Sequence, residues 1–310
     1  MLKEKVLIRE VGLRDGLQLL NKFCPTDIKI KWLEQQYKLG FKEIEITSFV
    51  SEKIMPQFKD SKIILEKANK MICFKPFVLV PNLKGANIAL ENYAKNINFV
   101  ISASESHNLA NVNSSVLNSL SGLKSFLTKL KETNIREKIF VSVTIATSFG
   151  CSIEGDIDNS EVLKIFEKLV QFSVDEIGIA DTVGYGNPKS VKKLIKEIKS
   201  IDGKIPLVGH FHDTRGMGML NILSALDEGI RKFDTSVQGL GGCPFAPGAS
   251  GNVVTEDCVF FLEEIGFDTG IDLKGILELS KKIQLWLPDE RFFGKFSLSG
   301  LPKKKIYKNL

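Results

Sequence analysis

Two histidines separated by a single residue, His210 and His212, are the side chains of this sequence best suited to bind a metal. They lie in the segment LVGHFHDTRG, residues 207–216. Residues i and i+2 of a β-strand point to the same face with Cα atoms about 6.6 Å apart, so both imidazoles can face one site. A lone pair of this kind is equally compatible with two hydrogen-bonded histidines at a strand end. The pair therefore predicts a metal site only if further ligands accompany it.

Two oxygen-bearing side chains in glycine-rich segments could supply these further ligands. Asp15 lies in GLRDG and Asn252 follows GASG. Carboxylate and amide oxygens together with imidazoles form the mixed ligand set that Mg²⁺ or Mn²⁺ accepts. No cluster of cysteines accompanies them, which disfavours a structural zinc site. The predicted ligands of a divalent cation, Mg²⁺ or Mn²⁺, are Asp15, His210, His212 and Asn252.

Three further charged residues lie in or directly after predicted strands and are candidates for catalysis. Arg14, directly before Asp15, can face developing negative charge, with a plain surface ion pair as the alternative. Glu45 and Asp181 are interpreted either as buried carboxylates that hold a cation such as Arg14 or as groups that transfer protons. Both alternatives remain open from the residues alone.

One cysteine lies in a segment rich in glycine. Cys243 belongs to GGCPFAPGASGN, residues 241–252, and a thiol on a segment that can move suits a proton donor that closes over bound substrate. The alternative for any cysteine is a small apolar filler. His107, in SASESHN, is expected to line the same pocket without an assigned role.

Strand-like and helix-like segments alternate along the whole chain, which predicts parallel β/α units. Eight such repeats indicate a single (β/α)8 TIM barrel over residues 1–270, with an extra C-terminal helix and a basic tail over 271–310. A doubly wound open sheet is the alternative, but its glycine-rich phosphate turn is missing. The predicted strands span residues 6–12, 43–49, 74–81, 97–104, 139–148, 175–181, 206–212 and 233–239. Helices are expected over 26–40, with Thr26 as the N-cap, and over 159–172, 187–201 and 273–287.

The composition excludes several classes of protein. The net charge of +5 is spread over mixed-sign segments, and no patch of basic and aromatic residues points to nucleic acid. No apolar stretch reaches the ~20 residues of a membrane span. Five cysteines without a CxxC pair indicate a reducing compartment, and the early first strand leaves no room for a signal peptide, so a cytoplasmic protein is expected.

The motifs together resemble the 3-hydroxy-3-methylglutaryl-CoA (HMG-CoA) lyase family, within a wider group of metal-dependent barrel lyases and Claisen-type synthases. Related synthases carry Gly-Glu-Arg-x-Gly-Asn where this chain has GGCPFAPGASGN, which favours cleavage over condensation. The matching segments are REVGLRDGLQ, IEITSFVS, VPNLKG, SASESHN, FGCSIEGDI, DTVGYGNP, GHFHDTRGMG and GLGGCPFAPGASGNVVTEDCVFFLEEIG.

The resemblance implies a role for each candidate residue. Asp15, His210, His212 and Asn252 would bind the cation, Arg14 would stabilise substrate charge, Cys243 would be the catalytic thiol, and Glu45 and Asp181 would line the site. The general base would be His210 or Asp181.

The implied reaction is retro-Claisen cleavage of HMG-CoA to acetyl-CoA and acetoacetate, as in leucine degradation and ketone body formation. It implies an acyl-CoA substrate and a homodimer. Alternatives are a lyase for a related 3-hydroxyacyl-CoA such as citramalyl-CoA, an aldolase for a smaller hydroxy acid, a Claisen-type synthase, or a non-catalytic barrel that binds a CoA ester.

Overall fold

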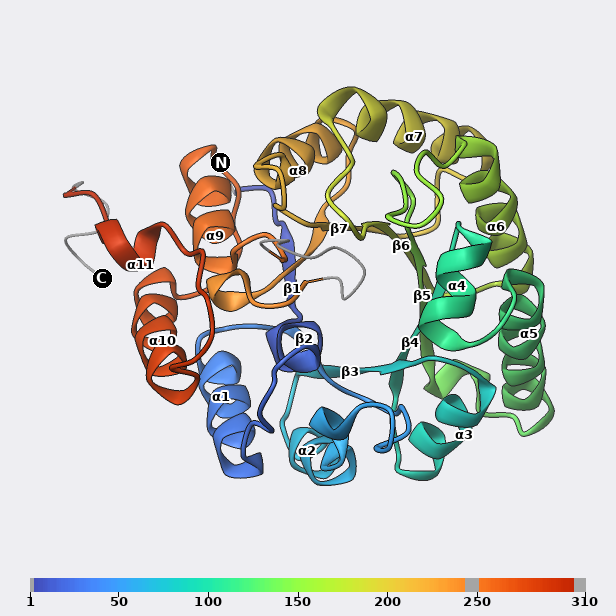
Figure 1. Ribbon diagram of the computed structural model, residues 1–310, viewed down its shortest axis with the longest axis horizontal. Coiled ribbons are helices and arrows are strands. Elements are labelled where there is room, and N and C mark those ends of the chain that lie inside the picture. The colour runs from blue at the N-terminus through green and yellow to red at the C-terminus, as the bar shows by residue number, and fades with distance from the viewer. Residues whose placement is uncertain (1–2, 243–250, 304–310) are drawn as a thin grey trace.

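Parallel strands close into a barrel with helices around it (Figure 1). The computed structural model describes residues 3–242 and 251–303. The strands pair in sequence order, and β8 pairs back with β1. The predicted (β/α)8 barrel and all eight of its strands are confirmed. The strands are β1 Leu7–Glu10, β2 Glu43–Ser48, β3 Lys75–Val80, β4 Asn96–Ser102, β5 Phe140–Ala146, β6 Glu176–Asp181, β7 Leu207–Phe211 and β8 Lys232–Thr235.

The helices lie outside the barrel, and each except the short α11 buries part of its surface. In α7 the buried residues Val191, Leu194, Ile195 and Ile198 recur at the spacing of a helix face. The remaining faces are polar. The helices are α1 Thr26–Lys38, α2 Ser61–Ala68, α3 Leu83–Glu91, α4 Glu105–Val112, α5 Val116–Glu132, α6 Asn159–Phe172, α7 Pro188–Ile201, α8 Gly218–Asp227, α9 Thr255–Glu264, α10 Leu273–Trp286 and α11 Phe296–Ser299.

The start of α1 corrects one expectation. Thr26 is the first helical residue and not the N-cap, which is Pro25, and no side chain caps this end. The Pro25 carbonyl instead accepts the backbone N–H groups of Ile28 and Lys29, at 3.0 and 3.1 Å. Proline has an extended ψ here that suits the N-cap position, so the turn starts one residue earlier than a search for a hydroxyl cap predicts.

The interior of the barrel is charged, where the branched apolar residues usual in this fold would be expected. Arg9 donates from Nε to Asp234 at 2.8 Å and from Nη1 to Glu176 at 2.7 Å. Lys232 donates to Glu176 and, at 2.9 Å, to Glu43. Each carboxylate is buried, so the opposite charges offset the cost of removing them from water. This network fixes side chains that reach from the barrel interior toward the strand ends.

The last long helix packs outside the barrel, against one early and one late helix. Helix α10 packs against α1 and α9 and buries Leu273, Ile276, Leu279 and Ile283, and Figure 1 shows it beside α1 and α9. The predicted helix over 273–287 is therefore present.

Within residues 3–242 and 251–303, none of the helices has the length and apolar character needed to span a bilayer.

Candidate active site and metal centre

A tight turn after β1 brings Arg14 and Asp15 to the mouth of the barrel. Residues Gly12–Gly16 form one turn of π-helix, η1, in which the N–H groups of Arg14, Asp15 and Gly16 all point at the carbonyl of Val11, at 3.1, 2.7 and 3.3 Å. Such turns are rare and are frequent at functional sites. All five residues are buried. The turn thus holds two charged side chains rigidly at the edge of a cavity that both line.

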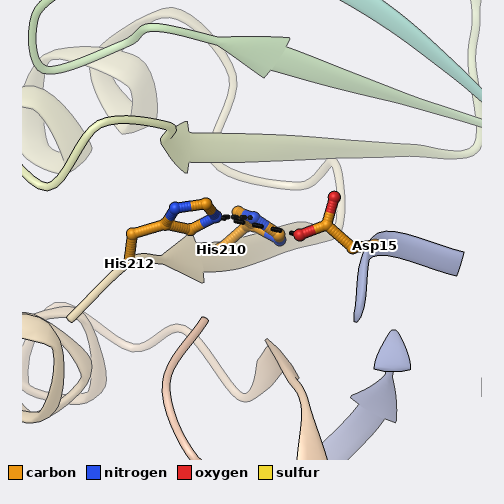
Figure 2. A group of neighbouring side chains, drawn as sticks. All are labelled: Asp15, His210 and His212. Carbon is orange, nitrogen blue, oxygen red and sulfur yellow. Dashed lines mark hydrogen bonds and ion pairs between the residues drawn. The ribbon is translucent and has the colours of Figure 1, made fainter. Parts of the chain in front are cut away.

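Strand β7 supplies His210 to the same cavity, and His212 follows directly after the last residue of the strand. Their Nε2 atoms lie 3.2 Å apart, and His212 Nε2 lies 3.9 Å from Asp15 Oδ2. Candidate ligand atoms of the three residues all lie within 4.8 Å of one another. Figure 2 shows the two imidazoles and the carboxylate pointing toward a common centre from two separate elements. At this spacing a single cation can be reached by all three side chains.

Asn252 completes the group. Residue 252 forms an antiparallel bridge with His212, and Asn252 Nδ2 donates to Asp15 Oδ2 at 2.6 Å and to the Leu240 carbonyl at 3.0 Å. Its Oδ1 atom is buried and has no hydrogen-bond partner among the residues described. An unpartnered buried oxygen beside two imidazoles and a carboxylate fits a hard or borderline divalent cation. The structure therefore brings together all four residues predicted as ligands.

The charge states of Asp15 and His212 suit metal binding. Burial alone would raise the pKa of Asp15, but Arg14, His210 and His212 together lower it, so the carboxylate is ionised. Burial and the neighbouring His210 lower the pKa of His212 to about 3, so its imidazole is neutral, as a ligand must be. Burial also acts to lower the pKa of His210, but the hydrogen bond and charge of Asp234 outweigh it and raise that pKa.

Glu45 holds Arg14 in place. The guanidinium donates from Nε to Glu45 Oε2, and its Nη1 donates to Asp15 at 2.6 Å and to Gln18 at 3.2 Å. The other oxygen of Glu45 accepts from Asn98 Nδ2 at 2.8 Å. Of the two roles left open for Glu45, the geometry fits the supporting one, since both of its oxygens are engaged.

Asp181 does not line the cavity, which corrects the expectation for this residue. Its neighbours Ala180 and Thr182 face the cavity, and successive residues of a strand point to opposite sides. The Asp181 carboxylate instead accepts the N–H groups of Tyr185 and Gly186, at 2.8 and 3.0 Å. Burial raises its pKa to about 6, although these backbone bonds oppose the rise. Asp181 therefore orders the loop between β6 and α7.

Two further residues line the cavity beside the predicted ligands: Asp234, which the sequence motifs do not predict, and His107, which they do. Asp234 on β8 lies 3.2 Å from His210 Nδ1 and lines the cavity. The available signal was Asp234 two residues after Lys232, which places both side chains on the same face of the strand. His107 lines the cavity as expected, with Nδ1 2.7 Å from Ser102 Oγ. Cys243 lies outside the described residues.

Glycine at position 251 is required for Asn252 to reach the site. Gly251 has a φ of +78°, and a Cβ there would lie 1.6 Å from the Gly241 carbonyl oxygen. We expect Gly251→Ala to displace Asn252 and to weaken Mn²⁺ binding at least tenfold, the loss typical of a disturbed ligand environment. Isothermal titration calorimetry would measure it. Gly155→Ala is the matched control, because Gly155 has a φ of +79° but no atom near its Cβ position. Equal Mn²⁺ affinity in both variants would contradict the expectation.

Comparison with known proteins agrees with the geometry. The HMGL-like family model matches residues 5–283. Hydroxymethylglutaryl-CoA lyase YngG of Bacillus subtilis is 37% identical over 281 residues, which cover 91% of this chain and 93% of that protein. The cytoplasmic 3-hydroxy-3-methylglutaryl-CoA lyase of Rattus norvegicus is 39% identical, over 89% of this chain and 80% of the relative.

A solved structure extends the likeness to three dimensions. The HMG-CoA lyase from Acinetobacter baumannii, in complex with coenzyme A and 3-methylmalate, superposes with a TM-score of 0.90 at 38% identity and covers 97% of this chain and 96% of its own. The match to the family model spans most of the sequence, and the match covers 80% to 96% of the length of these relatives. The chain therefore belongs to the HMGL-like family.

Proposed function

We propose that this protein is a carbon–carbon lyase that cleaves HMG-CoA to acetyl-CoA and acetoacetate with the help of a divalent cation, Mg²⁺ or Mn²⁺. The observation that carries the proposal is the meeting of Asp15, His210, His212 and Asn252 beside Arg14 in one buried cavity. Relatives named as HMG-CoA lyases over nearly the whole chain support the choice of substrate. A barrel that only binds a CoA ester would need no such ligand set.

The shape of the surface accommodates both ends of an acyl-CoA. The cavity at the ligands is small, about 120 Å³, and suits a short acyl group. A groove of about 610 Å³ shares Ser48, Val50 and Pro81 with it and runs on between β2, α2 and α3. Lys84 and two further exposed lysines line this groove. The longer CoA arm would lie there, with its phosphates near the lysines.

The residues divide the proposed chemistry among them. A bound cation would lower the pKa of the substrate hydroxyl and orient the acyl group. Of the two groups predicted as acceptor of the hydroxyl proton, His210 and Asp181, His210 would serve as a ligand instead, because an imidazole that binds the cation through Nε2 and carries its proton on Nδ1 has no lone pair left to accept another. Arg14, fixed by Glu45, would stabilise negative charge on the thioester oxygen as the carbon–carbon bond breaks. Cys243 would return a proton to the enolate carbon and so release acetyl-CoA.

A substrate panel tests the proposed function. Purified protein with Mg²⁺ or Mn²⁺ is expected to release acetyl-CoA and acetoacetate in equal amounts from HMG-CoA, and to cleave citramalyl-CoA far more slowly. Coupled assays for each product would follow the reaction. Cleavage of citramalyl-CoA alone would reassign the acyl group, and tight binding of HMG-CoA without any cleavage would favour the non-catalytic alternative.

Three expectations stay predictions of the sequence: a homodimer, a role in leucine degradation and a cytoplasmic location. The last has some support in the described residues, because Cys24, Cys73, Cys151 and Cys258 all carry free thiols, as is usual in a reducing compartment.

A further inference from the structure

The two histidines of the site differ in the hydrogen-bond partner of Nδ1. His210 Nδ1 lies 3.2 Å from Asp234 Oδ2, whereas His212 Nδ1 is buried without a hydrogen-bond partner in the described part of the chain. The contact is built into the barrel, because β7 pairs with β8 in a register that sets residue 210 beside residue 234. One imidazole is therefore oriented by the protein, and the other depends on what it binds.

Asp234 is itself held firmly. Its Oδ1 accepts from Arg9 Nε at 2.8 Å, and Arg9 also donates from Nη1 to Glu176 at 2.7 Å. The guanidinium carbon of Arg9 lies 4.7 Å from the centre of the Phe77 ring, and the arginine is fully buried. An arginine fixed on three sides directs one oxygen of Asp234 toward itself and leaves the other for His210.

We infer that Asp234, held by Arg9, is a positioning residue that keeps the proton of His210 on Nδ1 and leaves the Nε2 lone pair for the cation. A histidine that binds a metal through one nitrogen commonly donates its other N–H to a carboxylate, which fixes the tautomer and the ring orientation. His210 Nε2 is the atom that faces His212, on the ligand side of the ring. The inference rests on the cation site proposed above and adds to it a residue outside the ligand set.

The variant that tests the inference is Asp234→Asn. The amide can turn its NH₂ group toward His210 Nδ1 and stabilise the tautomer with the proton on Nε2, which cannot bind a cation. We expect Mn²⁺ affinity, measured by calorimetry or by the spin resonance of free Mn²⁺, to fall about 10- to 100-fold. Glu176→Gln is the matched control: it removes the other buried carboxylate bound to Arg9 but does not touch His210, so its Mn²⁺ affinity is expected to stay near wild type.

A second measurement uses the wild-type protein and so does not depend on whether a variant folds. The chain has only three histidines, so long-range ¹H–¹⁵N spectra of the Mg²⁺-loaded wild type can resolve each ring. The inference expects the His210 proton on Nδ1. A proton on Nε2, or equal Mn²⁺ affinity in Asp234→Asn and wild type, would overturn it. A wild-type chain that binds no Mn²⁺ would overturn the cation site and, with it, this inference.

Discussion

Chelation with EDTA is expected to abolish HMG-CoA cleavage, and His212→Ala is expected to lower it by about 10³-fold or more at moderate Mg²⁺, because a bound cation supplies several kcal/mol of transition-state stabilisation. His212 is a predicted ligand whose imidazole is neutral over the whole physiological range, because burial and the neighbouring His210 lower its pKa to about 3. Its removal leaves Asp15 and His210 in a predicted ligand set that has one nitrogen ligand fewer. Steady-state rates of acetoacetate release, with and without added Mg²⁺ or Mn²⁺, would measure the loss.

The controls separate loss of the cation from other damage. Activity removed by EDTA should return when excess Mg²⁺ or Mn²⁺ is added. His107→Ala is the matched variant, since His107 lines the same cavity but lies outside the predicted ligand set, and its Mn²⁺ affinity should equal that of the wild type. Full cleavage in EDTA after prolonged dialysis would refute a role for the cation.

Cys243→Ala is expected to lower kcat about 10²- to 10⁴-fold while KM stays near the wild-type value. A proton donor to the enolate carbon acts only after the carbon–carbon bond breaks. Its loss therefore removes an interaction made in the transition state of the proton transfer, and not one made with the ground-state substrate. The thiol must be protonated to act, so its pKa should not be depressed. Initial rates over a range of HMG-CoA concentrations would separate kcat from KM.

Cys73→Ala is the control for the thiol. Cys73 is exposed and lies before β3, far along the chain from the ligand residues, so its removal should leave both constants unchanged. An alkylating reagent should still inactivate Cys73→Ala, because this variant keeps the thiol of Cys243. Wild-type kcat in Cys243→Ala would exclude the thiol from the mechanism and leave the proton donor to another group of the cavity.

The charged interior of the barrel explains how a site on loop and strand ends can be rigid. Arg9 links β1 to β6 and β8 through Glu176 and Asp234, and Lys232 links β8 to β2 and β6. These bonds tie together strands that are distant in sequence and lie directly beneath the ligands. Side chains whose positions are fixed by such bonds need little reorganisation when substrate binds, which favours catalysis.

The sequence by itself determined the barrel and its eight strands, and it predicted the four candidate ligand residues that the fold brings together. Strand and helix periods are local properties, and eight repeats of them leave few closed arrangements. In a parallel barrel all strands end at one face, so polar residues at strand ends such as Asp15, His210 and His212 must gather there. This is why residues as far apart in the chain as Asp15 and Asn252, 237 positions, could be assigned to one site without coordinates.

Only the tertiary structure decided what each side chain does at that site. It showed that Asp181 faces away from the cavity, that Glu45 holds Arg14, and that Asp234 backs His210. It also showed that Gly251 brings Asn252 against Asp15. The physical reason is that these facts depend on contacts between segments far apart in the chain and on which way a side chain at a strand end turns, and local sequence patterns encode neither.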